Sequence, residues 1–144
     1  MAYLAATWQF WAVLAAVFAA LTAVFAKIGV STIDPDLATF IRTIVIVVLL
    51  GLIVLWKNSA AGLSELSPRA LIFLVASGIA TGASWLCYFR ALHIGDASRV
   101  APVDKLSVVF VAVIAAIFLG EQLSVSGWAG VALIAIGSVL VAVS

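Results

Sequence analysis

The stretch VAPVDKLSVVFVAVIAAIFLGE, from Val100 to Glu121, is long and apolar enough to cross a lipid bilayer as a helix. It nevertheless carries two charged residues, Asp104 and Lys105, close to its start. Because a charge at or inside the membrane boundary is costly, such residues are candidates for function. The stretch therefore predicts a membrane span with a candidate site near one end.

The composition of the whole chain extends this prediction to almost every residue. The chain has 144 residues, of which 67% are hydrophobic and 9% are charged, and its mean hydropathy is +1.36. A soluble domain usually has about 25% charged residues, so this chain cannot cover a surface that faces water. We expect an all-α integral membrane protein with the lipid bilayer as its surroundings.

The same composition argues against several classes of function. A net charge of +1 does not provide the basic patch that nucleic-acid binding needs. One cysteine excludes an internal disulfide and a cysteine-based metal site, and one histidine cannot build a metal site alone. No set of residues for nucleophilic catalysis and no paired catalytic carboxylates are apparent. We therefore expect no enzyme activity, no metal and no cofactor.

Five segments of the chain are long and apolar enough to be transmembrane helices. They cover about residues 8–27, 35–56, 68–92, 98–119 and 125–143. Because they use nearly all of residues 1–144, we expect a single transmembrane domain. Several residues are candidates to cap these helices: Asp34 before Pro35, Ser67 before Pro68, Ser98, and Ser124 or Ser126.

Five crossings place the two chain ends on opposite sides of the membrane. Tryptophans mark the helix ends on the side of the N-terminus: Trp8, Trp11, Trp56 and Trp128. Lysine and arginine are more frequent on the other side, which favours an outside N-terminus and an inside C-terminus. If Arg42, Arg90 and Lys105 are buried functional groups, however, the count becomes equal, and dual orientation stays open.

Asp104 and Lys105 are the first candidates for a substrate site. Neighbouring residues on a helix do not face each other, so each is expected to pair with another group, such as Arg90 or Arg42. One of the two would bind a charged substrate or relay a proton. The alternative is structural: in a helix beginning at Pro102, Asp104 would favour the helix dipole while Lys105 extends to the headgroups.

Arg42 and Arg90 are the next candidates. Arg42 lies about two turns into its span, where its planar fork of donors suits a substrate anion. The structural alternative is an ion pair with Asp34, Asp36 or Asp104, and Arg90 allows the same two interpretations nearer the membrane interface. Lys27 is expected to do no more than end the first helix, where a cation is favourable.

The third span carries a polar stripe at helical spacing, formed by Ser77, Thr81, Ser84 and Tyr88. These side chains are candidates to line a permeation path, but serine and threonine in membrane helices often bond only to their own backbone. Trp85 and Tyr88 are candidates to stack on a substrate, and packing is the alternative for both.

Three motifs in order resemble the EamA domain of the drug/metabolite transporter superfamily. They are YFRALHIGDASRVAP, then a small-residue helix ending in FLGE, then GWAGVALIAIGSVLV. The sequence is most similar to the short five-helix bacterial and archaeal members, in which VAPVDKLSVVFV replaces the more usual glutamate-proline of helix four. FAKIG and the arginine of FIRT extend the resemblance to essentially the whole chain.

The resemblance implies a small-molecule transporter or exporter in the plasma membrane of a prokaryote. Family members commonly have two five-helix repeats of opposite orientation, and this chain has one EamA-type repeat. We therefore expect a homodimer, possible as an antiparallel pair, that transports its substrate between the subunits by alternating access. The first helix lacks the acidic residue of the small multidrug resistance proteins, which argues against proton-coupled transport of cationic drugs through that residue.

Cations outnumber acids inside the spans, which favours an anionic or zwitterionic substrate. Coupling to protons through Asp104, or to an exchanged metabolite, is compatible with the sequence. The alternative from another class is a non-transporting membrane subunit or assembly partner, whose charges would be structural pairs.

Overall fold

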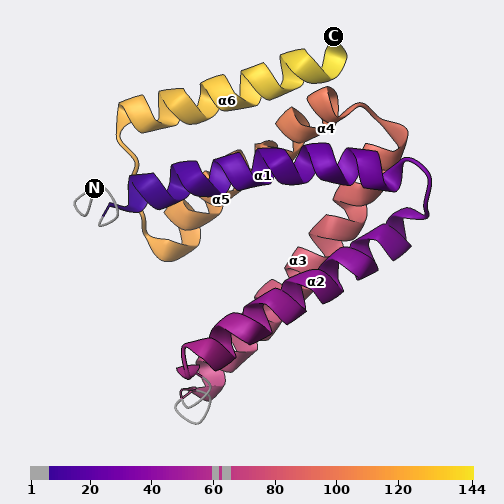
Figure 1. Ribbon diagram of the computed structural model, residues 1–144. Helices are drawn as coiled ribbons and strands as arrows, with labels where there is room; N and C mark the ends of the chain where they lie inside the picture. The colour runs from indigo at the N-terminus through magenta and orange to yellow at the C-terminus, as the bar shows by residue number, and fades with distance from the viewer. Residues whose placement is uncertain (1–6, 60–61, 63–65) are drawn as a thin grey trace. The chain divides into compact units, whose positions relative to one another are not determined.

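The computed structural model describes residues 7–59, 62 and 66–144, and in these residues it contains helices and no strand (Figure 1). The elements are α1 (Trp8–Val30), α2 (Pro35–Trp56), α3 (Pro68–Ile94), α4 (Ala97–Asp104), α5 (Leu106–Ile114), the π-helix η3 (Ala115–Leu119) and α6 (Val125–Val143). Because α4, α5 and η3 follow one another in a single span, the described helices form five segments long and apolar enough to cross a membrane. The fold class predicted from the sequence is confirmed.

The helices begin at the capping residues that the sequence predicts, with one exception. Asp34 accepts hydrogen bonds from the backbone N–H groups of Asp36 and Leu37, both at 3.0 Å. The Ser67 and Ser124 hydroxyls accept from the N–H groups of Ala70 and Gly127. The prediction for Ser98 is wrong, because the N-cap residue of α4 is Asp96 and Ser98 lies inside the helix.

The fourth span is an interrupted helix. Pro102 lies inside α4 and has no N–H group to continue the ladder. The helix then breaks at Lys105, whose backbone has φ −69° and ψ −8° and whose N–H contacts the carbonyls of Ala101 and Pro102 at 3.3 and 3.1 Å. Regular helix resumes at Leu106, so the two charged residues lie at the interruption.

The same span also ends irregularly. Its last turn, η3, is a π-helix. This conformation is rare in proteins overall, and where it occurs it is often at a functional site. Gly120 follows with φ +68°, in the left-handed region that glycine adopts without strain. The Glu121 N–H closes the turn on the Ala115 carbonyl at 3.2 Å, which agrees with the tight turn expected at FLGE.

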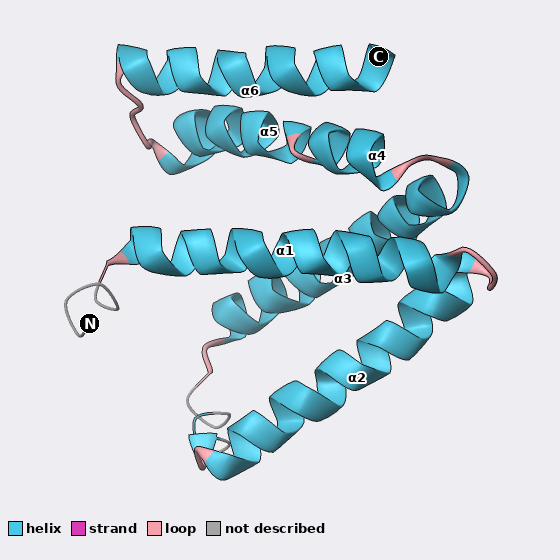
Figure 2. Ribbon diagram, turned by 45° about the horizontal axis from the view of Figure 1, so that its top comes forward, coloured by secondary structure: helices cyan, strands magenta, loops and turns pink. Residues whose placement is uncertain are grey.

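The chain divides into two compact units, one of residues 28–93 and one that contains residues 94–144 and the chain up to Lys27. In the second unit, α6 lies along α4 and α5 (Figure 2). The Arg99 guanidinium donates to the Ser144 carbonyl at 2.7 Å, and the Lys27 ammonium donates to the Gly95 carbonyl at 2.8 Å. Lys27 therefore does more than end the first helix, because it bonds to the loop that precedes the fourth span. The helix α1 itself continues beyond Lys27 to Val30.

In the unit of residues 28–93, the start of α2 contacts the end of α3. Asp36 pairs with Arg90, and Arg42 lies on Trp85. Moving forward along α2 therefore corresponds to moving backward along α3, so the two helices are antiparallel in this region. At the same end the His93 ring nitrogen Nδ1 is 2.8 Å from the carbonyl of Val30, which is fully buried.

Candidate functional site

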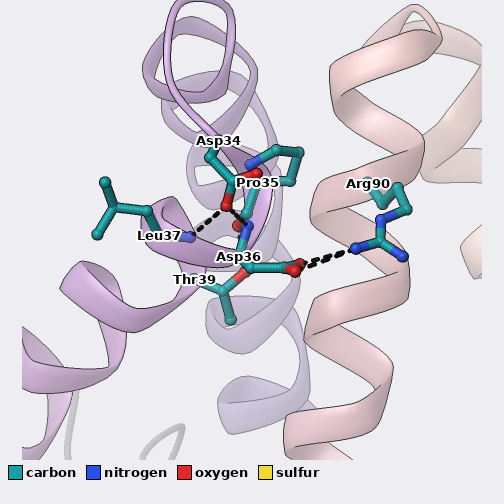
Figure 3. Close-up of polar contacts among 6 residues, drawn as sticks. All are labelled: Asp34, Pro35, Asp36, Leu37, Thr39 and Arg90. Atoms are coloured by element: carbon teal, nitrogen blue, oxygen red, sulfur yellow. Dashed lines mark hydrogen bonds and ion pairs between the residues drawn. The ribbon is translucent and has the colours of Figure 1, made fainter.

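Arg90 and Asp36 form an ion pair between α3 and α2 (Figure 3). A terminal nitrogen of Arg90 lies 3.1 Å from both carboxylate oxygens of Asp36. The side chains are 66% and 51% exposed in the chain alone, and Asp36 lies in the first turn of α2. The arginine that pairs with Asp36 is thus Arg90. The pair joins the first turn of α2 to the last part of α3.

Arg42 interacts with aromatic rings in place of a carboxylate. Its guanidinium carbon lies 4.2 Å from the centroid of the Trp85 ring and 5.3 Å from that of Phe89, which is one turn further along α3. These distances are those of cation–π contacts. Among the residues that the structure describes, no hydrogen bond or ion pair reaches this guanidinium.

Within residues 28–93, Arg42 forms no ion pair with Asp34 or Asp36, two of the three aspartates named as its structural partners, while a pairing with Asp104 in the other unit stays a prediction. Asp34 is engaged in capping α2 and Asp36 binds Arg90. Arg42 lies six residues beyond Asp36, which is about 9 Å along a helix. At that level α3 presents aromatic side chains.

Two predicted site residues, Trp85 and Tyr88, gather around Arg42, and one further residue joins them. Tyr88 contacts Phe89 edge to face, with ring centroids 6.5 Å apart, and lies within electrostatic range of Arg42. Phe89 is 3% exposed and was not predicted from the sequence. Its only signal was its position four residues after Trp85, on the same helix face.

Two members of the polar stripe of α3, Ser77 and Thr81, are joined by a hydrogen bond within the helix. The Thr81 hydroxyl donates to the Ser77 carbonyl at 2.9 Å, and Ser84 is exposed. Thr39 and Thr43 on α2 bond to their own helix in the same way, at 2.9 and 2.8 Å. These contacts match the alternative of backbone bonding, and a role in lining a path stays a prediction.

Asp104 and Lys105 form an ion pair with each other. The Lys105 ammonium lies 3.1 Å from a carboxylate oxygen of Asp104, and the side chains of Lys105 and Asp104 are 53% and 36% exposed. The expectation that they pair with other groups is wrong, because the ammonium of Lys105 reaches the carboxylate of its neighbour Asp104. The helix-dipole alternative is also wrong, since α4 begins at Ala97 and Asp104 is its last residue.

Arg42 and Asp104 each lie at a similar distance along the helix from the start of their own span. Arg42 comes seven residues after Pro35, and Asp104 seven residues after Ala97, which is about 10 Å of helix in each case. Groups at such a level are suited to bind a charged solute that enters the bilayer region. Within residues 7–59, 62 and 66–144, no cluster of three or more potential metal ligands is present.

Comparison with known proteins gives two similarities. The model of the EamA-like transporter family matches residues 6–143. A curated relative from Sinorhizobium sp., named "Uncharacterized transporter in cobO 3'region", is 57% identical over 137 residues, which cover 95% of this chain and 97% of the relative. No solved structure matches the chain.

Proposed function

The chain belongs to the EamA-like transporter family and is a membrane transporter of the drug/metabolite superfamily, and we propose that it carries a small anionic or zwitterionic molecule. It works as a homodimer by alternating access in the plasma membrane of a prokaryote. Each subunit supplies a single transmembrane domain with one EamA-type repeat.

The interrupted fourth span is the observation that carries this proposal. Lipid-facing backbone must remain hydrogen-bonded, so breaks in a membrane helix are tolerated where protein or a water-filled cavity surrounds them. Broken helices and ionised residues are also typical of the binding sites of transporters. In this chain the break and the charged pair coincide at Asp104 and Lys105.

The sparse burial of side chains in the single chain supports a second copy. Among the described residues, the buried ones are Ala23, Val30, Ala38, Thr39, Phe89, Leu92, Ala115 and Ser138. The relative from Sinorhizobium sp. is matched over 97% of its length, so it is about as long as this chain. Two copies would together supply the ten helices that a family member with two repeats contains in one chain.

Transport by the full-length protein in proteoliposomes tests the site. Uptake of a panel of radiolabelled small carboxylates, amino acids and amines is compared between wild type and empty liposomes. In Asp104→Asn and Lys105→Ala we expect uptake to fall by roughly 10- to 100-fold, the effect of losing a hydrogen bond to a charged group. Chemical crosslinking should show unchanged dimer assembly.

Glu121→Gln is the matched control, because it removes a carboxylate after the same span and outside the helix break. It should transport at the wild-type rate. Full transport by both site variants would reject the assignment of Asp104 and Lys105. Purification of the chain only as part of a complex with a different membrane protein would instead favour the assembly-partner function.

A further inference from the structure

We propose that Arg42, held by Trp85 and Phe89, binds a carboxylate group of the transported molecule. The inference rests on the proposed transport function and specifies its substrate class as small monocarboxylates. It concerns the unit of residues 28–93 and is independent of the charged pair in the fourth span.

The geometry of the stack determines which atoms of Arg42 are available. Trp85 and Phe89 lie within cation–π distance of the guanidinium carbon, at 4.2 and 5.3 Å from their ring centroids. A cation–π contact uses none of the hydrogen-bonding capacity of the guanidinium, so the rings leave its five N–H donors without acceptors. Two of these donors match the two oxygens of a carboxylate.

The position of Arg42 makes an acceptor necessary. The residue lies about 10 Å into its span, where few waters reach and unsatisfied donors cost several kcal/mol. In the described part of the chain no acceptor bonds to it, whereas Arg90 on the facing helix has Asp36. An acceptor from outside the unit therefore completes this site.

The local charge selects the type of anion. Arg90 is neutralised by Asp36, so Arg42 contributes a single positive charge at this level of α2 and α3. A monoanion balances one charge, whereas a phosphate dianion would leave excess negative charge in a region of low dielectric. The half-buried aromatic side chains of Trp85 and Tyr88 suit an apolar body attached to the carboxylate, whereas Phe89 is buried and contacts the guanidinium.

Thermal unfolding of the full-length protein in a phosphate-free maltoside detergent tests the inference. Benzoate is the probe, and benzamide is its neutral analogue of nearly the same size and shape. A ligand that binds only the folded state raises the Tm by an amount that grows with the logarithm of its concentration above Kd. We expect benzoate to raise the Tm and benzamide to leave it unchanged.

Variants then assign the effect to the stack. Arg42→Gln should weaken the apparent affinity for benzoate by roughly 10- to 100-fold, because a hydrogen-bonded charge is lost. Arg42→Lys should retain part of the response, and Trp85→Leu should weaken it by misorienting the guanidinium. Arg69→Gln, a matched loss of an arginine at the exposed start of α3, should behave as wild type.

Several outcomes would overturn the inference. They are a wild type that does not respond to benzoate, an equal response to benzamide, and an undiminished response of Arg42→Gln. Stabilisation by added phospholipid but not by benzoate would identify a lipid phosphate as the acceptor. Tighter benzoate binding in Asp104→Asn would identify a protein carboxylate as the partner.

The transport function fails separately. A wild type that binds benzoate through Arg42 but moves no solute in proteoliposomes would contradict transport and leave the carboxylate site standing. A wild type that transports amines, with Arg42 variants unimpaired, would contradict the carboxylate site and leave transport standing.

Discussion

Arg42 and Arg90 show how one helix pair gives two arginines different environments. Arg90 lies near the end of α3, where the first turn of α2 supplies Asp36 as a partner. Arg42 lies farther along α2, where α3 supplies the rings of Trp85 and Phe89. Arg90 is therefore paired with a carboxylate of this unit, whereas Arg42 contacts aromatic rings, and its donors are those that we propose for the ligand.

A double-mutant cycle on Asp36→Asn and Arg90→Gln measures the outer pair. Both side chains are more than half exposed in the chain alone, so we expect a coupling energy of about 0.2–1 kcal/mol in the free energy of unfolding. Asp36→Asn should cost more than Arg90→Gln, because Asp36 also interacts favourably with the N-terminal dipole of α2. Reversible unfolding in mixed micelles gives the four free energies. A coupling above about 3 kcal/mol would mean that the pair is buried in the assembled protein.

At the level of the helices, α2 and α6 have the bounds expected from the sequence, whereas α1 continues to Val30 and α3 continues to Ile94. Length, apolar composition and the caps at Asp34, Ser67 and Ser124 are local signals, and each is confirmed. The break at Lys105 and the π-helix η3 were not predicted, because they depend on which backbone hydrogen bonds form. Pro102 could have indicated the break, but proline is also common at the start of a helix. In the structure the helix already begins at Ala97, and Pro102 lies inside it.

The candidate site was predicted in part for the same reason. Arg42, Trp85 and Tyr88 stand out as polar or aromatic residues inside apolar spans. Phe89 does not, since phenylalanine is ordinary in a membrane helix. Its role becomes apparent only when the register of α2 against α3 places it beside Arg42. The pairing of Asp104 with Lys105 likewise depends on the positions of the two side chains and occurs at the break in the helix.

Gly120 is the position where the turn after the fourth span depends on a residue type. Its φ of +68° is strained for any residue with a side chain, while no heavy atom lies within 4 Å of the position that an added Cβ atom would take. Gly120→Ala should therefore destabilise the protein by about 1–2 kcal/mol through backbone strain alone. Gly51→Ala, inside α2 and equally open, is the control and should stabilise by roughly 0.5–1 kcal/mol. Equal effects of the two alanines on the free energy of unfolding would contradict the left-handed turn.

Among the residues that the structure describes, most large apolar side chains are exposed at the surface of the single chain. Members of every span remain exposed, among them Phe18, Leu55, Phe73, Phe118 and Leu133. Lipid can cover such surface, and in the dimer that we propose a second copy would cover part of it. A five-span chain whose loops carry balanced charge has no strong preference for one orientation, and two opposite orientations would reproduce the inverted repeats of transporters.

Labelling of single cysteines in intact cells tests this arrangement. In a Cys87→Ser background, Ala2→Cys and Ser144→Cys are treated separately with an impermeant thiol reagent. If Arg42, Arg90 and Lys105 belong to the site, they are left out of the count of loop cations. The side of the N-terminus then has two cations, Lys57 and Arg69, and the other side also has two, Lys27 and Arg99. With two cations on each side, we expect each end to be labelled in about half of the molecules. Asn58→Cys, in the loop after α2, should follow Ala2→Cys, and Thr32→Cys, in the loop after α1, should follow Ser144→Cys. Complete labelling at one end and none at the other would reject the antiparallel dimer, and a parallel dimer would then have to form the passage.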